Sequence, residues 1–338
     1  LVDAIHARGM KCMIDVVYNH TSPDSTLVKE HPEFFYRRPD GSMGNKVGDW
    51  TDVVDLDYGA KALWDYQLES LCYWAQYVDG FRCDVASTVP VDFWLAAREA
   101  VERVHPGMIW LGESVHLDHI RTFREHGFYA ATDTELFDAF DILYPYDLWP
   151  LYEGCTKGAL PLSRFFDVVD MQEVSFPTEY NKLRCVENHD QTRGAARFPD
   201  RASLLVWTAL SYFMKGTTLL YAGQEVCAAH TPSLFEREPI DWADGPDISG
   251  YLAKLAAVKK QLPTDEVFHI VADDEQGIVT ASYIGPERRA VGVFPLAGRG
   301  GSAAVPLADG NYADTLSGRT VAVRDGSLSV GTEAVILL

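Results

Sequence analysis

Short apolar segments alternate with amphipathic segments along most of the chain. Residues 11–18 are apolar at successive positions, which is typical of a strand covered on both faces in a parallel sheet. Residues 61–77 instead place their apolar side chains at helical spacing. The alternation repeats and predicts strands at 11–18, 78–83, 108–111, 140–143, 184–186 and 217–221. Helices are predicted at 61–77, 91–104, 117–126, 201–214 and 251–261, and the stretch before residue 184 is predicted to be irregular.

Polar side chains follow several of these predicted strands at the point where each one ends. They are Asn19, His20, Asp84, Glu113, His189 and Asp190. In a (β/α)8 barrel the carboxyl ends of all strands converge on one mouth, whereas an open, doubly wound sheet spreads them along an edge. The α/β fold predicted here is therefore a (β/α)8-type TIM barrel, of which about six strands are present.

The first nine residues read as the last turns of a helix that ends at a glycine cap. We therefore expect the two remaining barrel strands to precede Leu1 in a longer, N-terminally complete protein. A barrel with two strands missing exposes open edges, so we expect the chain by itself to fold poorly or to be inactive.

The composition changes near residue 267, where short segments rich in Val, Thr, Tyr and Gly are separated by turns about ten residues apart. This pattern predicts an antiparallel β-sandwich. Pro263 ends the last predicted helix. We predict a catalytic barrel domain over residues 1–263 and a C-terminal β-sandwich domain over residues 264–338.

The charge balance excludes one large class of partner. The chain has 29 basic and 49 acidic residues, a formal charge of −20, so it would repel a phosphate backbone and nucleic acid is not expected as a substrate. No stretch has the ~20 uncharged apolar residues of a membrane span, so no membrane partner is expected. Of the six cysteines, Cys12, Cys72, Cys83 and Cys185 lie in apolar segments, where free thiols are typical of a reducing compartment. We expect a cytoplasmic rather than a secreted protein, and the sequence does not indicate its oligomeric state.

Two of the strand-end residues are suited to two-carboxylate chemistry. Asp84 and Glu113 follow consecutive strands, so their side chains are expected to face each other across a pocket. Arg82 lies on the same strand face as Asp84 and would keep it ionised. Glu113 has no neighbouring cation in the sequence, so we expect it to hold a proton more readily. An ionised nucleophile opposite a protonated acid is the pairing of retaining glycoside hydrolysis.

Four strand-end segments together resemble a known family. They are DVVYNH at 15–20, GFRCD at 80–84, GES at 112–114 and VENHD at 186–190, and in order and spacing they are similar to the signature segments of the α-amylase superfamily, glycoside hydrolase family 13. DLD at 55–57 resembles the fifth segment of that family. The resemblance covers residues 1–263, and YADTLSG at 312–318 looks like a turn of the family's C-terminal β-sandwich.

The resemblance implies a role for each motif residue. Asp84 would be the nucleophile, Glu113 the acid and base, and Asp190 a third carboxylate that grips the sugar hydroxyls. The implied substrate-binding residues are His20, Arg82 and His189, with Arg82 orienting Asp84. Asn19 would brace its strand end or, as in calcium-dependent members, bind a structural calcium ion. The reaction implied needs no cofactor.

The sequence also departs from the family pattern. Many α-amylases continue the second segment with a Lys-His pair that contacts the leaving-group sugars, whereas this chain has VAST at 85–88. Val85 is similar to the residue of α-1,6-acting glucosidases, and it also suits simple packing. In the insertion after residue 18 we expect Phe34, Phe35, Tyr36 and Trp50 to pin the loop to the barrel rather than to stack on sugars. Trp64, Trp74 and Trp94 are predicted to be core residues.

Three functional hypotheses follow. The first is a retaining enzyme that cleaves or transfers α-glucosyl units of starch-like glucans or of malto- or isomalto-oligosaccharides. The second is a catalytically inactive sugar-binding or subunit protein on the same barrel, but such members usually lack one of the three carboxylates. The third is a metal-dependent hydrolase, for which a paired histidine cluster would be needed and is not found in the sequence. Linkage preference, endo or exo action, and the choice between hydrolysis and transfer stay open.

Overall fold

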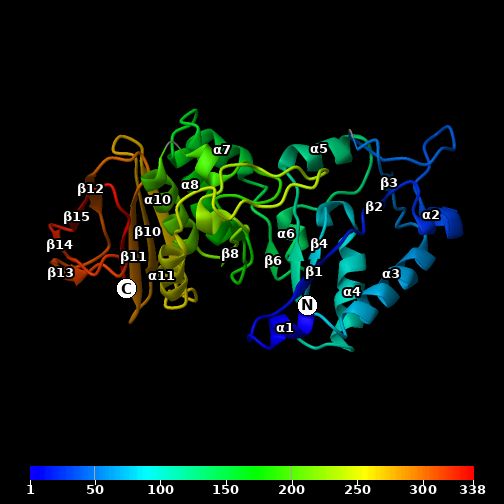
Figure 1. Cartoon of the computed structure of the whole chain (residues 1–338), viewed down its shortest axis with the longest axis horizontal. Coiled ribbons are helices and arrows are strands. Elements are labelled where there is room, and N and C mark those ends of the chain that lie inside the picture. Colours follow the sequence, from blue (N-terminus) through cyan, green and yellow to red (C-terminus); the bar gives the residue numbers. More distant parts are fainter. Residues whose placement is uncertain (49, 199) are drawn as a thin grey trace. The chain divides into compact units, whose positions relative to one another are not determined.

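The computed structural model describes residues 1–48, 50–198 and 200–338 of the chain. These residues form two compact units (Figure 1). Unit 1 consists of Leu1–Asp147 and Glu179–Asn181, and unit 2 consists of Leu148–Thr178 and Lys182–Leu338.

A four-stranded parallel sheet forms the centre of unit 1. Its order is β1-β4-β5-β6, with β1 at Met13–Val16, β4 at Gly80–Cys83, β5 at Ile109–Gly112 and β6 at Ile142–Leu143. Figure 1 shows α3 (Lys61–Trp74) and α4 (Val91–Glu102) beside this sheet, and these two helices contact each other. The shorter elements are α1 (Val2–His6), β2 (His20–Thr21), α2 (Thr26–Glu30), η1 (Pro32–Phe34), β3 (Val54–Asp55), η2 (Ala86–Thr88), α5 (Leu117–Glu125) and α6 (Asp133–Leu136).

The core of unit 1 is built around aromatic side chains of α4. Trp94 is completely buried, packs against Phe93 and Phe140, and donates from its indole nitrogen to the carbonyl oxygen of Ala86 at 3.1 Å. Trp74 is 44% exposed at the end of α3, so its predicted place in the core is wrong. Trp64 is partly buried against the same core.

Unit 2 begins with two helices that the sequence did not predict. α7 (Trp149–Thr156) and α8 (Ser163–Ser175) occupy the stretch predicted to be irregular, and α8 buries Phe165, Phe166 and Val169. Gly158 and Pro161 separate the two helices. α7 has only 8 residues, whereas the spacing of Phe165, Phe166 and Val169 in α8 was a helical signal that the prediction missed. The following elements are β7 (Leu183–Arg184), α9 (Gly194–Arg197), α10 (Arg201–Phe213), β8 (Thr217–Thr218), η3 (Gln224–Val226) and α11 (Ser249–Lys259), with β7 and β8 paired in parallel.

The C-terminal part of unit 2 consists of two four-stranded antiparallel sheets. One has the order β16-β11-β10-β9 and the other β12-β15-β14-β13. Ile278 and Val293 of the first sheet and Val323 and Leu328 of the second share one hydrophobic core. Their strands are β9 (Val267–Asp273), β10 (Ile278–Ile284), β11 (Arg289–Pro295), β12 (Gly301–Ala304), β13 (Gly310–Ala313), β14 (Thr320–Arg324), β15 (Ser327–Val330) and β16 (Val335–Leu337). The boundary drawn after residue 263 remains a prediction.

The cysteines are free thiols. Cys83, Cys155, Cys185 and Cys227 are buried, and Cys12 and Cys72 are partly buried. Among the residues that the structure describes, no helix has the length and apolar character needed to cross a membrane.

The two tryptophans of α3 and α4 give a direct test of this packing. Trp94→Ala should lower the free energy of unfolding by about 3–5 kcal/mol, because it removes a buried ring and its hydrogen bond. Trp74→Ala should lower it by less than about 1 kcal/mol, because the ring is half exposed. Urea unfolding of both variants measures the difference, and equal losses would contradict the burial described.

Candidate active site

The register of three parallel strands brings the predicted catalytic carboxylates together. Asp84 directly follows Cys83, and Glu113 directly follows Gly112, which is the register partner of Cys83. A side chain could not replace Gly112 without rearrangement, because a Cβ atom there would lie 2.9 Å from atoms of Phe140 and Leu143. The close packing before Glu113 therefore depends on glycine.

Arg82 contacts three carboxylate side chains of unit 1 at the strand ends. Arg82 Nη1 lies 2.5 Å from Asp84 Oδ1 and 3.0 Å from both carboxylate oxygens of Asp15, and Arg82 Nη2 lies 2.7 Å from Glu113 Oε1. The Arg82 side chain is only 10% exposed. Burial would lower the pKa of Arg82, but the charges of Glu113, Tyr144, Asp15 and Asp84 outweigh it and hold that pKa above its ordinary value.

This geometry corrects one expectation. Glu113 was expected to lie apart from any cation, but the structure places the Arg82 guanidinium directly against it. The contact could not be seen from the sequence, because it crosses from β4 to β5. One guanidinium therefore contacts three carboxylate side chains. Glu113 is the least exposed of the three, with 9% of its side chain accessible, against 19% for Asp84 and 55% for Asp15.

Val85 holds the second oxygen of Glu113. Its backbone N–H donates to Glu113 Oε2 at 2.9 Å, and Val85 itself adopts a left-handed conformation with φ 43°. A β-branched residue rarely adopts this conformation, so the surrounding contacts must maintain it. The Val85 side chain is buried with Val115, Ile120 and Phe123, which accounts for it as a packing residue.

Asn19 and His20 follow β1 and are linked to η2. The Thr88 hydroxyl lies 2.6 Å from Asn19 Oδ1, and Asn19 Nδ2 lies 3.3 Å from His20 Nδ1. Because the amide nitrogen can only donate, His20 Nδ1 accepts this bond, and Nε2 carries the proton of the neutral ring. His20 can therefore donate from Nε2 to a bound hydroxyl.

The surroundings of Asn19 do not fit a calcium ion. Its side-chain oxygen already accepts a hydrogen bond from Thr88, and the nearby Lys46 ammonium donates to the carbonyl oxygen of Leu56 at 2.8 Å. Burial lowers the pKa of Lys46, and the charges of Asp55 and Asp57 oppose that shift. A fixed ammonium beside these acids supplies the positive charge that a calcium ion would bring, and it would repel the ion. Asn19 is therefore better described as a brace of its strand end.

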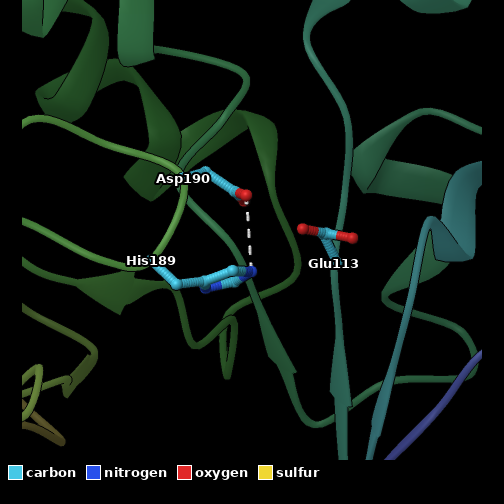
Figure 2. Close-up of side chains that lie close together, drawn as sticks. All are labelled: Glu113, His189 and Asp190. Atoms are coloured by element: carbon cyan, nitrogen blue, oxygen red, sulfur yellow. Dashed lines mark ion pairs between the residues drawn. The ribbon is translucent and has the colours of Figure 1, made fainter. Parts of the chain in front are cut away.

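Unit 2 carries the remaining predicted site residues on the loop after β7. Figure 2 shows the ion pair between His189 Nε2 and Asp190 Oδ1, which are 3.4 Å apart. Both side chains are about one third exposed, at 38% and 32%. Asn188 is buried, and its side-chain oxygen accepts from the backbone N–H of Asp190 at 3.0 Å. This bond orients the loop that presents Asp190.

A buried ion pair beneath this loop was not predicted. Arg193 is completely buried and lies 2.7 Å from Glu187 Oε1, while the backbone N–H of Gly194 bonds the other oxygen of Glu187. Arg193 also donates to the carbonyl oxygen of Ala222 at 2.8 Å and stacks on the Tyr221 ring at 4.0 Å. Burial raises the pKa of Glu187, and Arg193 opposes this shift. The pair closes the 187–194 loop and ties it to the segment after β8. In the sequence, the feature that could have indicated this pair is an acid and an arginine on either side of one polar loop.

Comparison with known proteins assigns the family. Residues 45–266 match the family described as "Alpha amylase, catalytic domain", and residues 269–337 match "Bacterial Alpha amylase C-terminal domain". The chain belongs to the α-amylase family. The predicted fold class, a (β/α)8-type catalytic domain followed by an antiparallel β domain, is confirmed by these matches.

Individual α-amylase family proteins are similar over different lengths. The crystal structure of an alpha-amylase from Lactobacillus plantarum matches 99% of this chain and 80% of its own, with 40% identity and a TM-score of 0.94. Alpha-amylase MalA of Haloarcula japonica is 26% identical over 66% of this chain and 33% of its own length. An alpha-1,4-glucan:maltose-1-phosphate maltosyltransferase of Rhodospirillum rubrum is 26% identical over 93% of this chain and 46% of its own. The chain thus spans between a third and a half of these two curated relatives.

The buried pair of unit 2 predicts a specific stability pattern. Arg193→Met should lower the free energy of unfolding by about 3–5 kcal/mol, because it leaves the Glu187 carboxylate buried without its cation. Adding Glu187→Gln to Arg193→Met should recover part of this loss. Chemical unfolding of the two single variants and the double variant measures the coupling, and strictly additive losses would show that the pair does not act as a unit.

Metal removal should not affect the fold. EDTA should change the melting temperature by less than about 1 °C, because the Lys46 ammonium already supplies positive charge beside Asp55 and Asp57. Lys46→Met should lower the melting temperature, since it removes a largely buried ammonium whose charge offsets Asp55 and Asp57. Differential scanning fluorimetry with EDTA or added calcium measures both effects, and a calcium-dependent rise of several degrees in the unmodified chain would refute this interpretation.

Proposed function

We propose that the protein is a retaining α-glucoside-active enzyme that works by double displacement. The observation that supports this most strongly is the arrangement of Asp84 and Glu113 on one buried guanidinium, in a chain of the α-amylase family. Arg82 was expected to bind substrate, but its nitrogens are engaged by carboxylates. We therefore assign it as a positioning residue.

The first half of the reaction forms a covalent intermediate. A carboxylate oxygen of Asp84 attacks the anomeric carbon, and the bond from that carbon to the leaving oxygen breaks. Glu113 transfers its proton to the leaving oxygen, so the aglycone departs as an alcohol. The step requires Asp84 as a carboxylate and Glu113 as the protonated acid.

The second half releases the sugar. Glu113, now a carboxylate, removes a proton from a water molecule or from a sugar hydroxyl, whose oxygen attacks the anomeric carbon and displaces Asp84. We also propose that Asp190 is the third carboxylate and that His20 and His189 bind sugar hydroxyls. No cofactor takes part.

The substrate class proposed is an α-glucan of starch type, or a malto- or isomalto-oligosaccharide. The Lactobacillus plantarum relative is an alpha-amylase, and the Rhodospirillum rubrum relative is a maltosyltransferase. Both water and a sugar hydroxyl are therefore plausible acceptors for this chain. The free thiols favour a cytoplasmic location.

A slow fluorosugar tests the assignment of the nucleophile. Incubation with a 2-deoxy-2-fluoro α-glucosyl fluoride type of inhibitor should label one residue, and peptide mass spectrometry should locate the label at Asp84. A label elsewhere would overturn the assignment. Binding of maltoheptaose without any turnover or label would favour the alternative, a catalytically inactive sugar-binding or subunit protein.

The acid role of Glu113 predicts a dependence on the leaving group. Glu113→Gln should lower kcat/KM by about 10²–10⁴-fold on maltoheptaose, whose leaving oxygen needs a proton. The loss should be much smaller on α-glucosyl fluoride, because fluoride departs with little proton donation. Asp84→Asn should abolish turnover of both substrates. Steady-state kinetics on the two substrates makes the comparison, and equal losses for Glu113→Gln would contradict the acid role.

A further inference from the structure

Trp50 differs from the other aromatic residues of the insertion between β2 and β3. Phe34 and Phe35 are each 3% exposed and pin the loop to the core of unit 1, as predicted. Trp50 was expected to do the same, but 37% of it is exposed. Core packing does not explain why this large ring is left partly exposed on a loop.

The neighbours of Trp50 place it over the carboxyl end of the sheet. Its ring lies 5.7 Å from the ring of His20 and 5.6 Å from that of His119, measured between centroids. His20 follows β1, and His119 lies in α5, which follows β5. In the sheet, β1 and β5 flank β4, and Asp84 directly follows β4. Trp50 therefore contacts residues that follow the two strands flanking β4.

The two histidines hold the indole in a defined orientation. His20 is held from behind by Asn19, and His119 stacks on Phe123 with 4.7 Å between centroids. Both ring contacts with Trp50 are tilted, at 55° and 31°, so neither histidine covers a whole indole face. With 37% of it exposed, Trp50 therefore presents part of its indole beside His20, which has an Nε2–H to donate.

We propose that Trp50 is a specificity-determining residue that stacks on a glucose unit next to the one that reacts at Asp84. A glucose ring presents C–H groups on its faces and hydroxyls at its rim, which matches an apolar ring bordered by a hydrogen-bond donor. The half-exposed position places Trp50 at the rim, beyond the buried carboxylates. Trp50 then favours chains of several glucose units over single glucosides. This inference rests on the proposed function.

Kinetics on a long and a short substrate tests the inference. Trp50→Ala should raise KM for maltoheptaose by about tenfold and change kcat by less than about threefold, because stacking beside the reacting sugar contributes mainly to binding. Values for α-glucosyl fluoride should stay within about twofold, because that substrate has no second sugar. Trp50→Phe should restore most of the affinity for maltoheptaose. Trp74→Ala is the matched control, because it removes another half-exposed indole from unit 1.

A binding measurement separates this inference from the proposed function. In a Glu113→Gln background, calorimetry should show about tenfold weaker maltoheptaose binding when Trp50→Ala is added, with an unchanged melting temperature. Unchanged affinity, or a loss shared equally by α-glucosyl fluoride, would overturn the role of Trp50. A lowered melting temperature in Trp50→Ala with normal affinity in Trp50→Leu would show that Trp50 only pins its loop. Turnover with the covalent label at a residue other than Asp84 would overturn the proposed function, while the binding comparison would still decide the role of Trp50.

Discussion

The guanidinium of Arg82 is the interaction on which the carboxylate site depends. It bridges Asp15, Asp84 and Glu113, which belong to or follow three neighbouring strands. Three carboxylates around one point would repel one another, and the largely buried Arg82 cation offsets that repulsion. The same residue therefore fixes the proposed nucleophile, Asp84, relative to the proposed acid, Glu113.

The Glu187–Arg193 pair has a different purpose. It is completely buried, so its attraction must offset the cost of removing both charges from water, and such pairs add little net stability. Its effect is geometric, because Arg193 also binds the segment after β8. The exposed residues His189 and Asp190 thus lie on a loop whose ends are held from within. The His189 and Asp190 side chains remain exposed, while the buried pair fixes the backbone of the loop that carries them.

The sequence predicted the parts of the fold and site that depend on local pattern. The parallel strands ended close to the expected residues, and Asp84, Glu113, His189 and Asp190 stood at their ends because a strand end is readable from a change in polarity. Contacts between strands were not readable, which is why Glu113 was expected to lack a cation. Trp74 was assigned to the core because helical spacing marks an apolar stripe but not its edge. The helices α7 and α8 were missed because Gly158 and Pro161 lie between them, so that the stretch as a whole looked irregular.

The insertion between β2 and β3 shows where specificity can vary without disturbing the chemistry. The carboxylates are held by strand register and by Arg82, neither of which involves this insertion. Lys46 anchors the insertion by donating to the carbonyl of Leu56 just after β3, and Val47 packs against the cluster that contains Val85. Trp50 can therefore be exchanged with little effect on how Asp84 and Glu113 lie. Where one loop sets the preferred glucan length and the strand ends hold the reacting carboxylates, that loop can change while Asp84 and Glu113 keep their positions.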